Sequence, residues 1–399
     1  MRPAAPKISP LRSHWPLRQG MVFLNHGSFG ACPFPVMEKQ AELRLAMDEA
    51  PLQFMNRHHT PRIDAARNEV APFVGADPAN FVFVTNATSG VNAVVRSLDF
   101  QPGDEILITN RGYNACDNTI REVARRSGAT IVVADVPFPL ESDDQIVTAV
   151  LAAVTPRTRL AMLDHITSAT ALVFPIERLV RELEAHGVDT LVDGAHAPGI
   201  LPLDLETLRP AYYTGNLHKW VCAPKGTAFL WVRPDKQDGL QPVVISHGNN
   251  TPRKGHSPFQ DRFDWPGTQD TTGWSCAPEA IRWLGQCLPG GWDEVRTHNH
   301  ELVVQGRNLI CKRLGLTPPC PDSMLGSMST LPMPEALATP QAKGEPDPAY
   351  ARLFDEFGIE LQVMPIDGRR WFRISAHLHN TLDEYRYLAE VLEKMAAGH

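Results

Sequence analysis

The sequence predicts an α/β protein with a large domain built on a mainly parallel seven-stranded sheet and a smaller α+β domain at its C-terminal end. Short apolar runs alternate with helical segments from about residue 60 to residue 235. A long polar stretch then interrupts the alternation, and a different mixture of strands and helices follows it. Short apolar strands separated by helices are typical of a parallel sheet that is covered by helices on both faces.

The apolar runs expected to form the large sheet are residues 81–84, 105–109, 130–134, 159–163, 190–193, 211–214 and 227–232. Apolar residues at helical spacing predict the intervening helices at 88–98, 114–126, 144–154 and 176–186. Right-handed crossovers should link these strands, and the carboxyl ends of the parallel strands should face one ligand crevice.

The polar stretch at residues 247–272 is rich in Gly, Pro, Asn and Asp and is interpreted as a functional loop. Helices are expected after it at 277–287 and 292–314. The small domain should contain strands at 326–331, 360–363 and 371–375, a helix at 348–357 and a final helix from Leu382. We therefore predict an N-terminal segment, 1–20, packed on the small domain, a large domain at 21–288 and a small domain at 289–399. The cleft between two such domains is a usual place for a ligand.

Composition and charge exclude several other classes of protein. The net charge of −7 argues against a nucleic-acid partner and against a polybasic membrane anchor. No apolar stretch reaches the length of a membrane span, and no apolar core of a signal peptide follows the basic N-terminus. The seven cysteines include no CxxC pair, which favours a cytoplasmic location over a disulfide scaffold or a cysteine zinc site. No metal is expected, because His58, His59, His247 and His256 lack the spacing of zinc ligands.

Asp193 and Lys219 form the strongest candidate site. Asp193 ends an apolar strand in TLVDGAHAPG, and Lys219 follows another strand in YYTGNLHKWVCAPKG. An amine and a carboxylate that converge at the carboxyl edge of a parallel sheet suit pyridoxal 5′-phosphate (PLP), since the amine forms a Schiff base and the carboxylate keeps the ring nitrogen protonated. In isolation a turn-capping Asp and a surface Lys would explain both residues. The apolar neighbours of Lys219 argue against that explanation, and Lys225, just before a glycine, is the weaker candidate.

A phosphate site is expected between the first strand of the sheet and its helix. The segment TNATSG, residues 85–90, has small residues that let the backbone approach a phosphate, and Thr88 adds a hydroxyl. A plain helix cap by Asn86 or Thr88 is the alternative. The nearby pair of Asp193 and Lys219 favours the phosphate.

These motifs resemble those of class V PLP enzymes of fold type I, within them the isopenicillin N epimerase-like branch. The resemblance covers about residues 20 to 380. It rests on LNHGSFG at 24–30, TNATSGVN at 85–92, DGAHAPG at 193–199, TGNLHKW at 214–220, GTQD at 267–270 and RISAHLHNT at 373–381. The pair formed by DGAHA and HKW is the most specific of these motifs.

The resemblance implies roles at the cofactor ring. Lys219 would carry the Schiff base and act as the catalytic base, and Asp193 would pair with the pyridinium nitrogen. His196 would bind the phenolic oxygen of PLP, Tyr113 would stack on the ring, and Ser168 would contact the ring oxygen or the substrate. A buried structural histidine and a packed tyrosine are the alternatives at His196 and Tyr113.

The resemblance also implies roles at the phosphate and at the substrate. The residues that would bind the phosphate are Asn86, Ala87, Thr88, Asn216 and His218, together with Thr268 reaching the site of a neighbouring subunit in a homodimer. The residues that would bind the substrate are Arg373, Asn25, His26, Gly27 and Arg57. Arg373 would pair with the α-carboxylate through its planar fork, although a core acid is an alternative partner. Arg57 could equally select a side-chain carboxylate or be an ordinary surface arginine.

The expected substrate is a small molecule that is, or contains, an amino acid. We expect epimerase-like chemistry first, through an external aldimine with Lys219 as base, and a C–S lyase or an aminotransferase of the same family as alternatives. A desulfurase is disfavoured because residues 358–373 contain no nucleophilic cysteine, and the nearest candidate is Cys320. A non-catalytic binding protein on the same fold would be expected to lack Lys219, Asp193 or Arg373, and all three are present.

Overall fold

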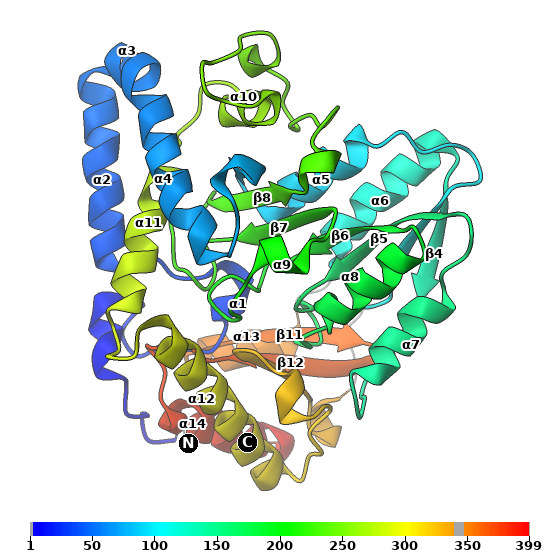
Figure 1. Cartoon of the computed structure of the whole chain (residues 1–399). Helices are drawn as coiled ribbons and strands as arrows, with labels where there is room; N and C mark the ends of the chain where they lie inside the picture. Colours follow the sequence, from blue (N-terminus) through cyan, green and yellow to red (C-terminus); the bar gives the residue numbers. More distant parts are fainter. Residues whose placement is uncertain (1–2, 339–346, 399) are drawn as a thin grey trace.

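The computed structural model describes residues 3–338 and 347–398. A seven-stranded sheet forms the centre of the molecule (Figure 1) in the order β2-β8-β7-β6-β5-β3-β4. Its strands are β2 (Phe81–Val84), β3 (Glu105–Thr109), β4 (Thr130–Ala134), β5 (Thr158–Asp164), β6 (Asp189–Asp193), β7 (Tyr212–Asn216) and β8 (Ala228–Val232). Strand β8 runs antiparallel to both of its neighbours, β2 and β7, and the other pairings of this sheet are parallel. The predicted mainly parallel sheet is therefore confirmed.

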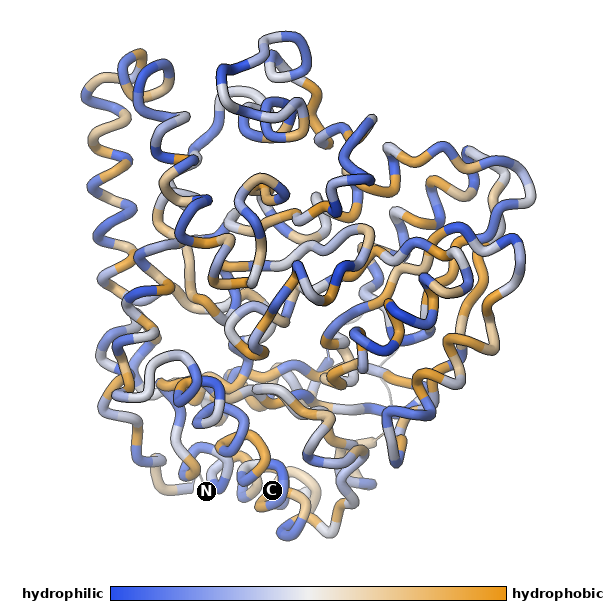
Figure 2. Tube along the Cα trace, in the orientation of Figure 1, coloured by the Kyte–Doolittle hydropathy of each residue, from blue (hydrophilic) through white to orange (hydrophobic). Residues whose placement is uncertain are grey.

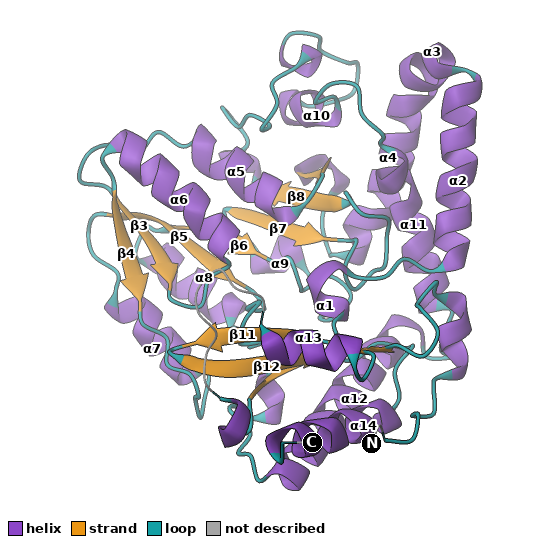
Figure 3. Cartoon of the chain, turned by 180° about the vertical axis from the view of Figure 1, so that it is seen from behind, coloured by secondary structure: helices purple, strands orange, loops and turns teal. Residues whose placement is uncertain are grey.

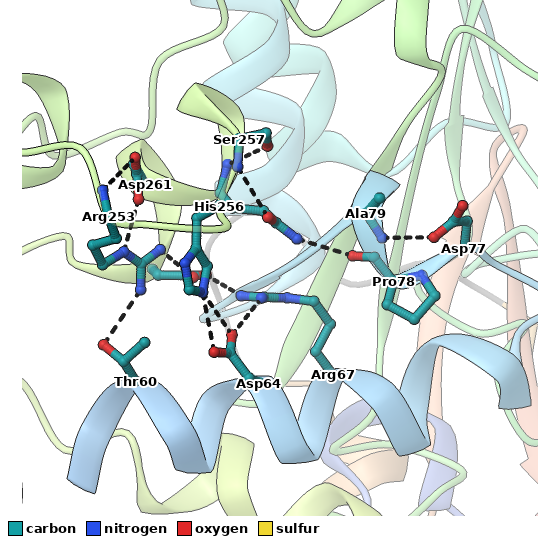
Figure 4. A network of polar contacts seen from close by, with 12 residues as sticks. Thr60, Asp64, Arg67, Asp77, Pro78, Ala79, Arg253, His256, Ser257 and Asp261 are labelled. Carbon is teal, nitrogen blue, oxygen red and sulfur yellow. Dashed lines mark hydrogen bonds and ion pairs between the residues drawn. The ribbon is translucent and has the colours of Figure 1, made fainter. Parts of the chain in front are cut away.

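Alternate residues of each strand pack against opposite layers of helices. In β2, for example, Phe81 and Phe83 belong to one hydrophobic cluster, whereas Val82 and Val84 belong to another. Both faces are covered, as Figure 3 shows, which explains the continuous apolar runs. The helices of the two layers are α5 (Ala87–Ser97) and α6 (Asn114–Ser127) on one face, and α7 (Asp144–Ala152) and α8 (Ile176–Ala185) on the other.

A helical hairpin precedes the sheet, in a region for which the sequence predicted no element. Its arms are α2 (Phe34–Glu49) and α4 (His59–Phe73), joined by α3 (Pro51–Gln53) and a π-helical turn at Phe54–His58. Helix α11 (Thr272–Gly285) packs along both arms (Figure 1). Figure 2 shows many hydrophilic residues along α2, in which only Val36 is buried.

The predicted loop 247–272 contains a helix that the sequence analysis missed, α10 (Pro258–Asp264). Ser257 caps it in a capping box with Gln260, and a proline occupies its first turn. These signals are characteristic of a helix start, although the helix is too short to show a period.

The C-terminal part forms a second layer of mixed structure. Its antiparallel sheet has the order β11-β12-β9, and a parallel pair joins β1 to β10. The strands are β1 (Val22–Phe23), β9 (Met328–Pro332), β10 (Ile359–Glu360), β11 (Gln362–Ile366) and β12 (Arg369–Ser375). The helices are α12 (Gly291–Leu314), α13 (Pro348–Asp355) and α14 (Leu382–Ala396). Strand β1 therefore ties the start of the chain to this α+β unit.

The N-terminal residues lie against the same unit. The hydroxyl of Ser9 donates to the carbonyl oxygen of Leu378 at 2.7 Å, and that of Thr381 donates to the carbonyl oxygen of Lys7 at 2.6 Å. In the described part of the chain, no helix is long and apolar enough to cross a membrane.

Candidate active site

A cavity of about 500 Å³ opens at the carboxyl ends of β5, β6 and β7, beside the start of α5. This is the edge at which the sequence predicted a ligand. Ten predicted residues line the cavity: Asn86, Ala87, Thr88, Tyr113, Ser168, Asp193, His196, Asn216, His218 and Lys219. Residues from five separate stretches of the sequence thus meet in one place.

Lys219 faces His196 inside this cavity. Its Nζ lies 3.1 Å from Nε2 of His196, and the indole N–H of Trp220 donates to Nδ1 of the same ring at 3.3 Å. Because Nδ1 accepts, the neutral ring carries its proton on Nε2 and donates it toward the lysine amine. Burial, together with the charge of Arg373, lowers the pKa of Lys219 to about 8, and burial holds the pKa of His196 well below its usual value. The lowered pKa makes the uncharged, nucleophilic form of the amine easier to reach near neutral pH than it is in an ordinary lysine.

Asp193 is held at the end of β6 by two donors. Its Oδ1 accepts the amide of Ala195 at 2.9 Å, and its Oδ2 accepts the thiol of Cys116 at 3.2 Å. A second carboxyl, Asp164, ends the neighbouring strand β5 and also lines the cavity. Burial and the charge of Asp193 raise the pKa of Asp164 well above its usual value, so Asp164 is the carboxyl of the pair that binds a proton more readily.

The start of α5 supplies backbone donors to the other end of the cavity. Asn86 caps the helix by accepting the amide of Ser89 at 2.8 Å, and Asn216 accepts the amide of Ala87 at 2.9 Å. Among the described residues, the amide of Thr88 between them has no acceptor. Gly90 allows the helix to sit close to β7, since a Cβ there would lie 2.5 Å from Oγ1 of Thr214. An anion at this helix start would receive the Thr88 amide and the helix dipole.

Arg373, on β12, lies beside this cavity. Its guanidinium donates to the carbonyl oxygen and the hydroxyl of Ser168, to the hydroxyl of Ser28 at 3.1 Å and to Oδ1 of Asn25 at 3.4 Å. No carboxylate pairs with it in the part of the chain that the structure describes, so the alternative of a core acid finds no support. Burial lowers the pKa of Arg373 to about 10. A buried guanidinium without a counter-ion is suited to a carboxylate ligand.

The remaining predicted residues lie elsewhere. His26, which was expected to bind the substrate, is fully buried and contacts the carbonyl oxygen of Lys219 instead. Gly27 packs against Met328 and Trp220, where a Cβ would meet their side chains. Arg57 lies in the π-helical turn and Thr268 on an exposed loop, and neither lines the cavity. Unlike these residues, Tyr113 does line the cavity, and 45% of its surface is exposed.

Six lining residues were not identified from the sequence: Ser28, Phe29, Ser89, Asp164, Ile166 and Ala195. Asp164 carried a usable signal, because it ends an apolar strand as Asp193 does. Ser28 follows directly on the predicted Asn25-His26-Gly27 segment.

The residues present fit PLP. The cavity brings together an amine of lowered pKa, a carboxylate that could face a ring nitrogen, and a helix start with an amide free for a phosphate. On this fold, these features define a PLP-dependent enzyme of fold type I. Asp193 and Lys219 would hold the ring and the aldehyde carbon, and Thr88 would hold the phosphate.

Comparisons with known proteins lead to the family. The chain matches the family Aminotransferase class-V over residues 43–319. It is 33% identical over 389 residues to an isopenicillin N epimerase of Streptomyces clavuligerus, an alignment that covers 94% of this chain and 95% of that protein. It is 29% identical over 417 residues to a putative L-cysteine desulfhydrase 1 of Oryza sativa subsp. japonica, covering 95% and 84% of the two chains. The chain therefore belongs to the class V aminotransferase family, and the predicted family and cofactor are confirmed.

A solved structure supports the fold. A mutant of C-DES with glycine covalently linked to its PLP cofactor superposes on this chain with a TM-score of 0.82 at 21% identity. The superposition covers 96% of this chain and 99% of that one. At this identity the likeness shows the fold alone, and it confirms the predicted fold class.

Proposed function

We propose that this PLP-dependent enzyme inverts the configuration at the α-carbon of an amino acid, with Lys219 as the base that takes the α-proton. One observation carries the proposal: the amine of Lys219 lines the cavity, and the guanidinium of Arg373, which lacks a carboxylate partner among the described residues, donates to Ser168 and Ser28 in the wall of the same cavity. The relative at 33% identity, an isopenicillin N epimerase, supports epimerase-like chemistry.

Each residue has a separate task in this proposal. When bound, PLP withdraws electrons from the α-carbon and so acidifies its proton. Arg373 binds the α-carboxylate and fixes the orientation of the substrate, and Ser168 and Asn25 hold the guanidinium in place. Lys219 accepts the α-proton on Nζ, and His196 keeps that nitrogen directed into the cavity. A second acid would return the proton from the other face, and the hydroxyl of the half-exposed Tyr113 is the candidate.

A C–S lyase is the second candidate, because it uses the same base and the same carboxylate site before a thiol leaves. The 29% identity to a putative L-cysteine desulfhydrase supports it. A desulfurase that uses a nucleophilic cysteine has no support, since no cysteine is among the residues that line the cavity in the described part of the chain. Cys116, the cysteine bonded to Asp193, is buried, and burial raises the pKa of its thiol far above the usual value.

We further propose a cytoplasmic homodimer in which Thr268 contacts the phosphate in the neighbouring site. The exposure of Thr268 on the loop before α11 supports this role, since a residue that reaches a partner must be accessible in one subunit. Arg57 is exposed as well, so both of its proposed roles stay open: a selector of a substrate carboxylate and an ordinary surface arginine.

The test is to incubate the protein, loaded with PLP, with a panel of amino acids in heavy water. We expect a yellow protein, α-hydrogen exchange and racemisation of at least one amino acid, whereas release of thiol, pyruvate and ammonia would identify the lyase instead. The Lys219→Ala variant should bind PLP weakly and exchange no α-hydrogen. The matched control is Lys225→Ala, because the Lys225 amine donates to the carbonyl oxygen of Gly30 and does not line the cavity. A wild-type protein that stays colourless with PLP would contradict the proposal.

A further inference from the structure

Three histidines lie in a buried layer directly behind Lys219, on the side away from the cavity. They are His26, the first residue of α1 (His26–Phe29), and His377 and His379, which follow β12. Each has no exposed surface. The ring of His26 stacks on that of His377 with centroids 4.2 Å apart. Buried polar rings require partners, and these partners define the role of the layer.

The hydrogen bonds of His26 fix its tautomer. Its Nε2 lies 3.1 Å from the carbonyl oxygen of Lys219, and its Nδ1 lies 3.1 Å from Nε2 of His379. A carbonyl oxygen can only accept, so Nε2 of His26 carries the proton and Nδ1 accepts from His379. Burial lowers the pKa of both rings well below the usual value, so each is neutral and carries one proton. The result is a directed chain from His379 through His26 to the peptide carbonyl of Lys219.

His377 makes a parallel contact with the next residue. Its Nδ1 accepts the amide of Leu378 at 2.9 Å, so its Nε2 carries the proton and points at the carbonyl oxygen of Trp220, 3.4 Å away. His26 and His377 also surround Cys222, whose Sγ lies 3.5 and 3.6 Å from the two Nε2 atoms. Ligand atoms of this kind could suit a metal ion. However, both Nε2 atoms already carry protons directed at carbonyl oxygens, so a metal ion would have to displace both protons and break both hydrogen bonds.

The lysine segment needs such support. Lys219 opens a tight turn in which its carbonyl oxygen also accepts the amide of Cys222 at 3.1 Å, and Cys222 adopts a left-handed φ of 60°. Helix α1 packs against this turn backbone to backbone. A Cβ at Gly30, where φ is 68°, would lie 2.3 Å from the carbonyl oxygen of His218. The orientation of the Lys219 peptide therefore depends on the groups of α1 that contact it, among them the His26 ring.

We propose that His26, oriented by His379, is a positioning residue for the reactive lysine. By donating to the Lys219 carbonyl it fixes the peptide plane from which the side chain departs, and so the direction of Nζ toward His196 and the cofactor carbon. The inference rests on the proposed role of Lys219. It also links the lysine to β12, the strand that carries Arg373, because His377 and His379 follow that strand directly.

Two substitutions at position 26 separate positioning from packing. Asn places its amide near the position of Nδ1 and cannot reach the Lys219 carbonyl, whereas Gln can place a donor where Nε2 lies. When apo-protein of the His26→Asn variant is mixed with PLP, we expect the cofactor to attach to Lys219 about tenfold more slowly than in the wild type. A change of this size corresponds to the loss of one buried hydrogen bond. We also expect a shifted pH midpoint for the visible absorbance of the bound cofactor. The His26→Gln variant should recover both properties to within about twofold.

A destabilised control separates these effects from general loss of stability. Val303→Ala removes two methyl groups from the small-domain core, away from the lysine, and should lower the melting temperature without changing either readout. If the His26→Asn variant does not fold, the comparison moves to His379→Leu against His379→Gln, with the same expectation. Wild-type behaviour of both readouts in the Asn or Leu variants overturns the positioning role and leaves the proposed function standing. A wild-type protein that never attaches PLP to Lys219 overturns the proposed function and this inference together.

Discussion

Asp164 and Asp193 are register partners on the neighbouring parallel strands β5 and β6, and each is the last residue of its strand. Both side chains line the same cavity, and Oδ1 of Asp164 has no hydrogen-bond partner in the described part of the chain. Two carboxyls placed this close cannot both ionise without a large cost. The thiol of Cys116 and the amide of Ala195 donate to Asp193, which stabilises the charge there and leaves the proton on Asp164.

The unequal charges predict unequal effects of the same substitution. Asp193→Asn removes the anion that would hold the protonated ring nitrogen, so the dissociation constant of PLP should rise about 10- to 100-fold, as for a lost charge-assisted hydrogen bond. Asp164→Asn replaces a neutral acid with a neutral amide and should change the constant by less than about threefold. Equilibrium titration of apo-protein with PLP measures both constants. Equal losses in the two variants would contradict the assignment of the proton to Asp164.

Arg373 should act on the substrate carboxylate and on little else. Arg373→Gln removes the buried guanidinium, and we expect KM for an amino acid that the enzyme processes to rise on the order of 100-fold. The KM of the Arg373→Lys variant should lie between those of the wild type and of Arg373→Gln, because an ammonium keeps the charge but lacks the planar fork of the guanidinium. The control ligand is the corresponding amine without a carboxylate, whose binding to the two variants should match its binding to wild type. A comparable loss for the amine would show that Arg373 supports the fold of the site instead.

Substitutions at Asn86 can separate the effect of this helix start on PLP affinity from its effect on the stability of the apo-protein. Asp caps helices as well as Asn does, so Asn86→Asp should leave the stability of the apo-protein within about 0.5 kcal/mol of wild type. The added negative charge would lie beside the phosphate and should weaken PLP binding about tenfold or more. Asn86→Ala should instead cost about 1 kcal/mol of stability through the lost bond to Ser89. Thermal unfolding without PLP and titration with PLP give the two quantities. Undiminished PLP affinity in the Asp variant would place the phosphate elsewhere.

The sheet could be predicted from the sequence because its buried strands are short apolar runs bounded by polar residues. The hairpin of α2 and α4 could not, since α2 buries only Val36 and therefore shows no apolar stripe. Stability of such a helix comes from its neighbours, here α11, which lies more than 200 residues later in the sequence.

Motifs located the site but did not give the directions of neighbouring side chains. Asn25 and His26 are adjacent in LNHGSFG, and we expected both near the substrate carboxylate. Because α1 begins at His26, the two side chains diverge: Asn25 contacts Arg373, and His26 contacts the far side of the lysine segment. The position of Asp164 at the end of an apolar run was visible in the sequence, but its pairing with Asp193 was not, since that pairing depends on the register of two strands.

Glu384 should make stability depend on pH far from the active site. This side chain is fully buried at the start of α14, where Oε2 accepts the amide of Thr381 at 2.9 Å and the side-chain amide of Asn380 at 3.0 Å. Oε1 has no hydrogen-bond partner among the described residues, and Arg12 lies 3.7 Å away. Burial outweighs these favourable contacts and raises the pKa of Glu384 to about 7.

The sign of the effect follows from proton binding. Between the unfolded pKa, about 4.5, and the folded pKa, about 7, the folded protein binds more protons at Glu384 than the unfolded chain does. The free energy of unfolding should therefore fall as pH rises through this window. The Glu384→Gln side chain keeps an acceptor for Asn380 and Thr381 but cannot ionise. The free energy of unfolding of this variant, relative to that of the wild type, should therefore rise by about 3 kcal/mol between pH ~4.5 and pH ~7. Urea unfolding at several pH values measures the difference.

Glu390→Gln, on the exposed side of the same helix, should show no such trend. A difference that stays constant with pH would mean that Arg12 neutralises the buried charge despite its distance, and that the N-terminal segment is held by an ion pair at all these pH values.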